Sequence, residues 1–283
     1  MLDYLSVALV WIALALHLQG ERRAAIITGR PRGTSARWRA ASFYAGLATI
    51  VIALLGPIDS LAETLFWVHM VQHVLLMTVA APLIVLGAPW MSLWRPLPLD
   101  WRRTVARSLV RSPALAPVRT AGRALGRPLG AWIAFNLNLA LWHIPAVYDL
   151  TLQNPGVHIL EHTSFLLFAI LLWAQVIESP PLRARLSSSG GAYYMVGTLI
   201  VGSLLSAVLV FAPTPLYPLY AHLADRPGGI SALTDQRLAG MVMLVLGSLS
   251  MVVYVFASLW RRLGQVPDGE DARRRRATAS VTS

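Results

Sequence analysis

Apolar residues along this chain gather in long blocks separated by polar connections. Seven blocks of 17 to 25 residues can be read, at 3–19, 40–56, 65–89, 129–147, 157–177, 192–212 and 238–260. About 20 apolar residues in a helix cross the hydrocarbon core of a bilayer. Only helices and closed barrels satisfy their backbone in lipid, and a barrel would show short alternating strands instead. The pattern predicts an all-α fold, a polytopic membrane bundle of about seven transmembrane helices.

The composition agrees with a membrane protein, because 56% of residues are hydrophobic, 13% are charged and the mean hydropathy is +0.58. We expect the first block to be kept as a helix, since Asp3 precedes it and Arg22 and Arg23 follow it, the reverse of a signal peptide. The chain is predicted to form one transmembrane domain over 1–263 and a disordered, basic cytoplasmic tail over 264–283.

The basic residues indicate an orientation in the membrane. All 24 are arginines, and 22 of them lie on alternate connections, within 22–39, 95–127, 183–185 and 261–276. The other connections hold only Arg226 and Arg237. Because basic residues beside membrane spans stay cytoplasmic, we expect the amino terminus outside and the carboxyl terminus in the cytoplasm of a bacterial inner membrane. The net charge of +11 thus reflects topology, and no nucleic-acid partner is predicted.

The long inner connection, 90–128, carries a helical pattern of its own. Trp101, Val105 and Leu109 share one face of a helix, and a set of arginines shares another: Arg103, Arg107 and Arg111. This pattern is typical of a helix that lies on the membrane surface. A solvated basic loop is the alternative, and four prolines would break any helix here into short pieces, at 96, 98, 113 and 117.

Five of the seven histidines fall near block ends that we place outside. His69 and His73 are one turn apart at the start of the third block, and His158 and His162 repeat that spacing at the start of the fifth. His143 lies near the end of the fourth block, about one turn below the same surface. The five side chains are therefore predicted to share one layer of the bundle.

A shared layer of histidines favours a metal site. Ionisable side chains are costly in lipid and usually face the bundle interior or a water-filled cavity. A single histidine is as often an interhelical hydrogen-bonding group as a ligand, but two pairs and a fifth residue supply the imidazole geometry that binds copper or zinc. The chain has no cysteine, so thiolate ligands are excluded. We predict a metal site formed by His69, His73, His143, His158 and His162.

Other polar and sulfur-containing side chains lie beside these histidines. Glu161 is a possible auxiliary group that orients a histidine ring or accepts a proton, and Gln72 could also orient a ring. A Glu at the membrane interface and a Gln in the core, without either role, are equally consistent with the sequence. Met77 continues the stripe of His69 and His73, and further thioethers would favour Cu(I) unless they serve only packing: Met70, Met241 and Met243. We assign no role to His17, and His222 is either an entry ligand or simply exposed.

Six motifs stand out between the second block and the end of the seventh: HMVQHVLLM at 69–77, APLIVLGAP at 81–89, WHIPAVY at 142–148, HILEH at 158–162, LYPLY at 216–220 and DQRLAG at 235–240. Together they resemble the multi-spanning CtaG family of cytochrome c oxidase assembly proteins. The stretch 241–245 departs from a Met-Trp-Val-Pro-like pattern found in many members. Without that proline, we expect the last helix to be straighter here.

The resemblance implies a non-catalytic assembly factor for a haem-copper oxidase, which supplies or handles copper at the outer face of the membrane. Oxidase subunits and the lipid bilayer are the implied partners, with a copper chaperone as a further candidate. The absence of cysteine excludes the mechanism of the single-span, cysteine-based chaperone that shares the CtaG name. Three alternatives stay open at this point: a haem-binding membrane protein, a copper or proton-coupled transporter, and a scaffold for oxidase subunits.

The arginine distribution yields a first testable prediction, on topology. A reporter fused after Arg276 should behave as cytoplasmic, and one inserted in 149–156 should behave as external, because 22 arginines retain their connections inside. Paired alkaline phosphatase and green fluorescent protein fusions measure this. The reverse pattern would overturn the orientation and the outer position of the histidine layer.

Overall fold

The structure, a computed structural model, describes residues 3–29, 33–222 and 226–263. Within these ranges the chain is helical, with no strand beyond one isolated bridge between Ser179 and Leu182. The longer helices are α1 (Asp3–Thr28), α2 (Thr34–Leu54), α4 (Phe66–Val74), α5 (Ala81–Gly87), α7 (Leu99–Arg111), α8 (Ala116–Leu125), α9 (Pro128–Trp142), α10 (Pro145–Gln153), α11 (Pro155–Trp173), α12 (Ser188–Phe211) and α14 (Ala232–Leu263). Shorter elements are α3 (Pro57–Ala62), the π-helix η1 (Leu75–Ala80), α6 (Trp90–Trp94), η2 (Pro113–Leu115), α13 (Pro218–Ala221) and η3 (Pro227–Gly229). The predicted all-α class is confirmed.

Four helices in the described part of the chain are long and apolar enough to cross a membrane: Phe66–Gly87, Pro155–Trp173, Ser188–Phe211 and Ala232–Leu263. The predicted count of seven spans and the orientation of the termini stay predictions. The fourth predicted block is shorter than expected, because α9 ends at Trp142 and Pro145 begins α10 in its place. The last helix is uninterrupted over 32 residues. The predicted tail, 264–283, lies outside the described residues.

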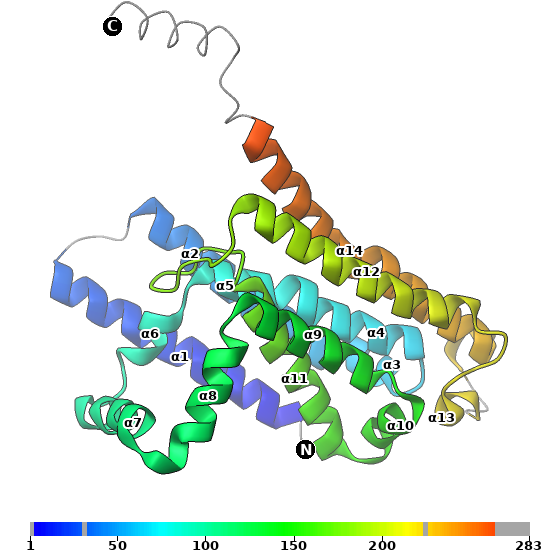
Figure 1. Cartoon of the computed structure of the whole chain (residues 1–283). Coiled ribbons are helices and arrows are strands. Elements are labelled where there is room, and N and C mark those ends of the chain that lie inside the picture. The colour runs from blue at the N-terminus through cyan, green and yellow to red at the C-terminus, as the bar shows by residue number, and fades with distance from the viewer. Residues whose placement is uncertain (1–2, 30–32, 223–225, 264–283) are drawn as a thin grey trace, which may run out of the picture.

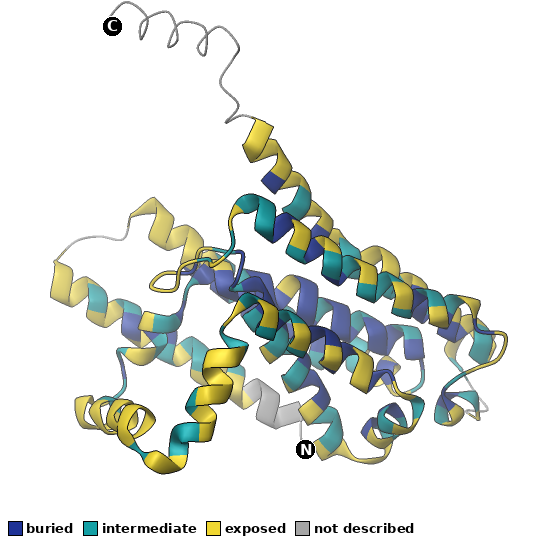
Figure 2. Ribbon diagram, viewed as in Figure 1, coloured by how far each residue is buried: buried dark blue, intermediate teal, exposed yellow. Residues whose placement is uncertain are grey.

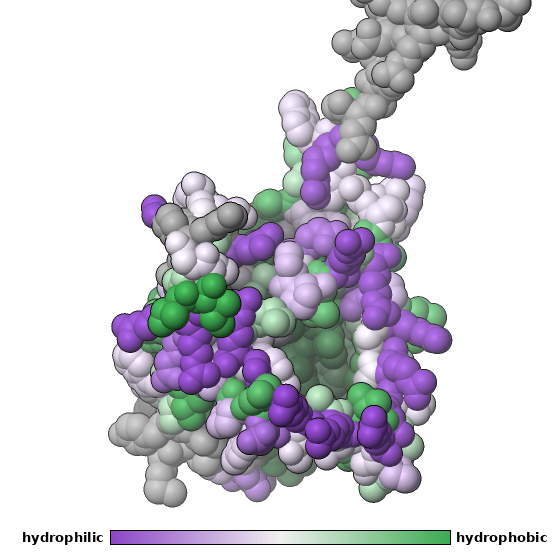
Figure 3. Space-filling view, turned by 90° about the vertical axis from the view of Figure 1, so that its left-hand side faces the viewer, coloured by the Kyte–Doolittle hydropathy of each residue, from purple (hydrophilic) through white to green (hydrophobic). Residues whose placement is uncertain are grey.

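The inner connection is helical, as its periodicity predicts. Trp101, Val105 and Leu109 lie on α7 and are exposed. Prolines separate the short helices here, since Pro98 precedes α7 and Pro113 begins η2. Figure 3 views the end of the molecule at which α6, α7 and α8 lie, and hydrophilic side chains gather there around a hollow with an apolar floor. The arginine-rich segments thus share one end of the bundle.

The helix formed by α4, η1 and α5 lies at the centre of the bundle (Figure 2). In its most apolar stretch 72% of the residues are buried, whereas the corresponding share for α14 is 11%. Helices α2, α11 and α14 pack around it, while α9 packs on α11 and α12 packs on α14 (Figure 1). Apolar side chains on every face favour such a central position, and His69, Gln72 and His73 are buried among them. The side chains of α4 are therefore held in position by the helices that surround it.

Glycines allow α2 and α5 to approach closely. A Cβ atom on Gly46 would lie 2.9 Å from Ile84 Cγ1 and 3.2 Å from the Ala80 carbonyl oxygen. A Cβ atom on Gly87 would lie 2.7 Å from Phe43 Cβ. Small residues at such contacts are the usual means of close helix packing in membranes. Any larger side chain would force α2 away from the central helix.

A π-helical turn interrupts the central helix between α4 and α5. Ala81 donates its backbone N–H to the Leu76 carbonyl, five residues earlier. The next hydrogen bond of this π-helical series would run from the N–H of residue 82 to the Met77 carbonyl. Pro82 has no N–H to donate. The indole Nε1–H of Trp173 on α11 donates to the Met77 carbonyl instead, at 3.0 Å. The π turn is thus bonded to α11, the other helix of the site described below.

The start of α4 is capped by a residue from the far end of the chain. Leu65 stands at the N-cap and its side chain offers no acceptor, so the first N–H groups need another partner. Asp235 of α14 accepts from the backbone N–H groups of Phe66 and Trp67, at 3.0 and 2.9 Å. Arg226 lies 3.7 Å from the same carboxylate. This contact fixes α14 to the end of α4 that carries the histidines.

The capping carboxylate gives a second prediction. Replacing Asp235 by Ala should reduce the free energy of unfolding by about 1–2 kcal/mol, the usual cost of losing a helix cap. Asp235→Asn retains an acceptor oxygen and should fall between this variant and the wild type. Thermal unfolding of the detergent-solubilised protein measures the difference. An unchanged midpoint for Asp235→Ala would show that the cap contributes nothing to stability.

Candidate metal centre

Two helices bring four potential ligands together inside the bundle. His69 and His73 lie one turn apart on α4, and Glu161 and His162 are neighbours on α11. One ligand atom from each of these four residues lies within 4.8 Å of the others. We call this set the His–Glu cluster. His69 and His73 of the third block thus converge with His162 of the fifth.

Local sequence explains how α11 presents its pair. Asn154 caps the helix, with its side-chain oxygen 2.8 Å from the Gly156 N–H group, and Pro155 occupies the first helical position. The helix therefore begins two turns before Glu161. Successive residues on a helix point about 100° apart, so Glu161 and His162 both reach the side of α11 that faces α4.

The carboxylate of Glu161 lies between the two rings of α4. Its Oε2 atom is 3.4 Å from His69 Nε2, and its Oε1 atom is 3.5 Å from His73 Nε2. The two Nε2 atoms are 3.0 Å apart. Metal–imidazole bonds of about 2.0–2.1 Å place two ligand nitrogens roughly 3 Å apart. The α4 pair therefore has the spacing that a shared ion requires.

The His–Glu cluster is buried and short of hydrogen bonds. Glu161 is 0% exposed, and neither of its carboxylate oxygens has a hydrogen-bond partner in the part of the chain that the structure describes. His73 Nδ1 and His162 Nε2 are also unpartnered in that part. Buried polar atoms are nearly always satisfied in native proteins. A cation bound by the carboxylate and the imidazoles would satisfy the two Glu161 oxygens, whereas His73 faces the carboxylate with its Nε2 atom and not with Nδ1.

The donor set fits a first-row transition ion. Three imidazoles and one carboxylate suit Cu²⁺ or Zn²⁺, whereas Mg²⁺ and Ca²⁺ prefer oxygen ligands alone. The chain has no cysteine, so no thiolate competes. Glu161, which the sequence suggested as an auxiliary group, lies at the middle of the cluster.

Two predicted ligands lie outside the His–Glu cluster. His143 ends α9, where its Nδ1–H donates to the Leu139 carbonyl at 2.7 Å, and its Nε2 atom has no partner among the described residues. The ring of His158 lies 4.2 Å from that of His162 and 5.1 Å from that of His69, between centroids. His158 is adjacent to the cluster and less buried than its members. A ligand role for either residue stays a prediction.

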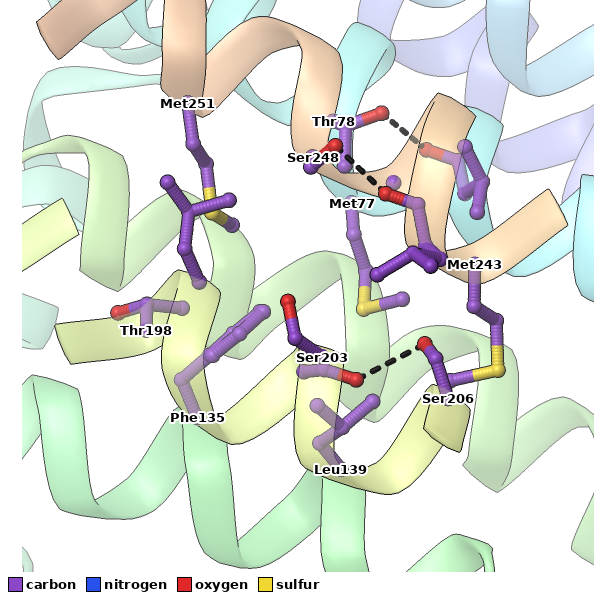
Figure 4. A pocket seen from close by; sticks show the side chains of 15 residues that line it. Met77, Thr78, Phe135, Leu139, Thr198, Ser203, Ser206, Met243, Ser248 and Met251 are labelled. Atoms are coloured by element: carbon purple, nitrogen blue, oxygen red, sulfur yellow. Dashed lines mark hydrogen bonds between the residues drawn. The ribbon is translucent and has the colours of Figure 1, made fainter. Parts of the chain in front are cut away.

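Met77 lines a separate small pocket of about 50 Å³. In Figure 4 its side chain lies with those of Met243 and Met251 between α9, α12 and α14, and none of the four cluster residues lines this pocket. The Ser206 hydroxyl, which also lines this pocket, donates a hydrogen bond to the Gly202 carbonyl of its own helix. Met70 is buried among aromatic side chains, and Met241 is 45% exposed. An auxiliary role for Met77 beside the His–Glu cluster stays a prediction.

Gln72 positions a helix instead of orienting a histidine ring. Its Nε2 group donates to the Ala53 carbonyl at 2.9 Å and to Asp59 Oδ1 at 3.0 Å. These bonds join α4 to the end of α2 and to α3. Of the remaining histidines, His17 Nδ1 lies 3.1 Å from the Tyr44 hydroxyl, and exposed His222 donates to the Pro218 carbonyl at 2.6 Å.

An aromatic layer covers the cluster, and the sequence reasoning did not identify it. Tyr220 donates its hydroxyl to the Ala62 carbonyl at 2.6 Å and lies 3.4 Å from His69 Nδ1. Burial raises the pKa of Tyr220 well above its usual value, so the hydroxyl stays a neutral donor. Tyr217 donates to the His143 carbonyl at 3.1 Å, and the Tyr148 ring lies 5.3 Å from the His69 ring. The three tyrosines belong to the motifs WHIPAVY and LYPLY, so these motifs could have indicated the layer.

Comparison with known proteins identifies a family. The family model described as cytochrome c oxidase caa3 assembly factor matches residues 22–265. No curated protein and no solved structure matches the chain. The matched range includes α2, α4, α11 and α14, and with them every residue of the His–Glu cluster and of the aromatic layer.

The geometry gives a third prediction. We expect the purified protein to bind one copper ion per chain, and the double variant His69→Ala/His73→Ala to lose it, because two of four donors are removed. Metal analysis after desalting measures this. His222→Ala is the matched control and should keep its copper, since that ring bonds Pro218 outside the cluster. Equal copper contents in the double variant and the wild type would exclude the cluster as the site.

Proposed function

Because the chain belongs to the cytochrome c oxidase caa3 assembly factor family, we propose that it binds a copper ion and hands it over during assembly of a haem-copper oxidase. The observation that carries the proposal is the buried Glu161 carboxylate, which lies among three imidazoles and lacks a hydrogen bond from the described residues. A buried charge needs a partner of opposite sign. A copper ion held by the His–Glu cluster supplies one.

Copper is here a cargo, and the chemistry is ligand exchange. Imidazole and carboxylate bind copper without the very tight hold of thiolates, so an acceptor with its own histidines and cysteines can take the ion. No bond in a substrate is broken, and the protein acts without catalysis. Oxidase subunits are the proposed acceptors, and a copper chaperone is a candidate donor.

We place the cluster near the outer face of a bacterial inner membrane, in a multi-pass protein with its amino terminus outside. The start of α4 lies at the end of the bundle opposite to α6, α7 and α8 (Figure 1). The arginine-rich connections belong to that second end, and basic connections stay in the cytoplasm. The two observations support an outer position for the His–Glu cluster, on the side where the oxidase's copper centres lie.

The geometry favours copper over haem. Haem needs a wide slot between the helices that supply its axial ligands. In the cluster, His69 and His73 lie 3.0 Å apart through their Nε2 atoms, and both rings contact Glu161 within 3.5 Å. The ring of His73 also packs on that of Phe165, 4.5 Å away between centroids. Aromatic and carboxylate groups occupy the space that a macrocycle would need.

A route for transport across the whole bilayer lacks support from the packing beyond the cluster. Towards the other end, η1, α9 and α11 pack through apolar side chains, among them Met77, Phe135 and Leu172. The buried polar exceptions on α9 are Asn136 and Asn138. A transporter would carry polar groups through the full thickness of the membrane. Binding and release on one side is therefore the function that we propose.

The fourth prediction tests copper delivery in cells. Replacing His73 and His162 by Ala should leave the protein in the membrane, because Ala is a good helix former and the change removes polar groups from the bundle. The amount of active, copper-loaded oxidase should fall, since losing two ligands costs more than the roughly 10–100-fold in affinity that a lost supporting contact costs. Oxidase activity and oxidase copper content at limiting copper are the measurements.

Added copper should partly restore this activity, because mass action replaces a missing carrier when the acceptor is intact. His222→Ala serves as the control and should retain full activity. Normal oxidase activity in the double variant at limiting copper would falsify copper delivery and leave a scaffold for oxidase subunits as the explanation.

A further inference from the structure

A cavity of about 220 Å³ lies against the His–Glu cluster. Side chains from α1, α2, α3, η1 and α11 enclose it. Its wall is mostly apolar, with leucines at positions 9, 47, 54, 76 and 166. Its polar side chains are few and belong to Asp59, His158, His162 and Thr163. His162 belongs both to the cavity and to the cluster.

The lining of the cavity includes both half-buried polar groups and buried residues. Asp59 and His158, near the ends of α3 and α11, are half-buried. Ile50, Leu76 and His162 are buried. An ion that enters beside Asp59 and His158 therefore meets the cluster through the His162 ring.

Other sides of the cluster are covered by packed side chains. The ring of Phe165 lies 4.5 Å from that of His73. The ring of Tyr148 and the hydroxyl of Tyr220 lie against His69. A well-packed interior leaves little room for a hydrated ion to pass between such groups. The cavity at His162 is thus the opening that the described residues offer.

Asp59 on α3 and His158 on α11 both line the cavity. Gln72 donates to Asp59 Oδ1 at 3.0 Å and thereby holds this carboxylate in the cavity wall. The His158 ring lies 4.2 Å from the His162 ring and 5.1 Å from the His69 ring. A carboxylate and an imidazole are ligands that copper accepts. These residues form a series that leads from the cavity to the cluster.

We propose that Asp59 and His158 form an entry site, which captures a copper ion in the cavity and passes it to the His–Glu cluster through His162. This inference rests on the function proposed above. The transfer is a ligand exchange at constant oxidation state: bonds from the ion to Asp59 oxygen and His158 nitrogen break as bonds to His162, Glu161 and the α4 pair form. The entry site sets the rate of loading, and the cluster sets the amount bound.

Loading kinetics of the full chain in lipid nanodiscs test the entry site. Cu²⁺ is mixed with the protein in a stopped-flow instrument, and quenching of tryptophan fluorescence reports binding; metal analysis gives the amount bound at equilibrium. Asp59→Asn removes the charge but keeps the oxygen that accepts from Gln72. Ala13→Phe fills the cavity from α1. Ala15→Phe is the matched control, because Ala15 is exposed on the same helix and does not line the cavity.

We expect Asp59→Asn to slow association about tenfold, the lower end of what electrostatic focusing contributes to an on-rate. Ala13→Phe should slow association as well, because its ring fills the cavity. Ala13→Phe should slow copper release as well, because both directions use the cavity. Both variants should still bind one ion per chain at equilibrium, and Ala15→Phe should match the wild type. This is the fifth prediction.

Wild-type association rates in Ala13→Phe and Asp59→Asn would overturn the entry site while leaving the cluster in place. Loss of the bound ion in Asp59→Asn at equilibrium would also overturn it, because Asp59 would then be a permanent ligand. A wild-type chain that binds no copper would instead overturn the proposed function itself. If Asp59→Asn fails to fold, the pair Ala13→Phe and Ala15→Phe decides the question alone.

Discussion

The buried carboxylate of Glu161 is the constraint on which the rest of the structure depends. A charged group inside an apolar bundle is costly unless an opposite charge or several donors compensate it. In this chain three imidazoles from two helices surround the carboxylate, and none of them gives it a hydrogen bond. The helix that carries two of them is the most buried of the four long apolar helices. One part of the central helix is thus organised around a polar group, while the rest packs through apolar side chains.

The polar residues of the bundle divide into two groups with different tasks. Those of the His–Glu cluster point at one another and have few other partners. Asp235, Gln72 and Gln236 bond to backbone groups of other segments, and Gln236 joins the Leu209 carbonyl to the Leu216 N–H group. Bonds of the second kind fix where helices begin and end. They hold α4 at the position that the first group requires.

The sequence was sufficient to predict the local features of the site but few of the contacts between distant segments. The four-residue spacing of His69 and His73 predicted a shared face, and the structure confirms that the two rings meet. Asp235 caps α4 from 168 residues away, a pairing that no local pattern encodes. The early end of α9 could have been predicted, because Pro145 stops a helix. The direction in which Gln72 points could not, since it depends on how α2 and α3 pack.

The π turn at 75–80 allows one helix to face two different partners correctly. Each residue of an α-helix advances the side chains by about 100°, so one additional residue in the turn rotates everything before it relative to everything after it. The histidine-bearing half is thereby aimed at α11, while the half that contains Gly87 is aimed at α2. Deleting a single residue within 75–80 would keep the hydrophobicity and the length of the span almost unchanged. It would nevertheless turn His69 and His73 away from Glu161 by about 100°, more than a quarter of a revolution. The number of residues in this segment is therefore as important for the site as the identity of the ligands.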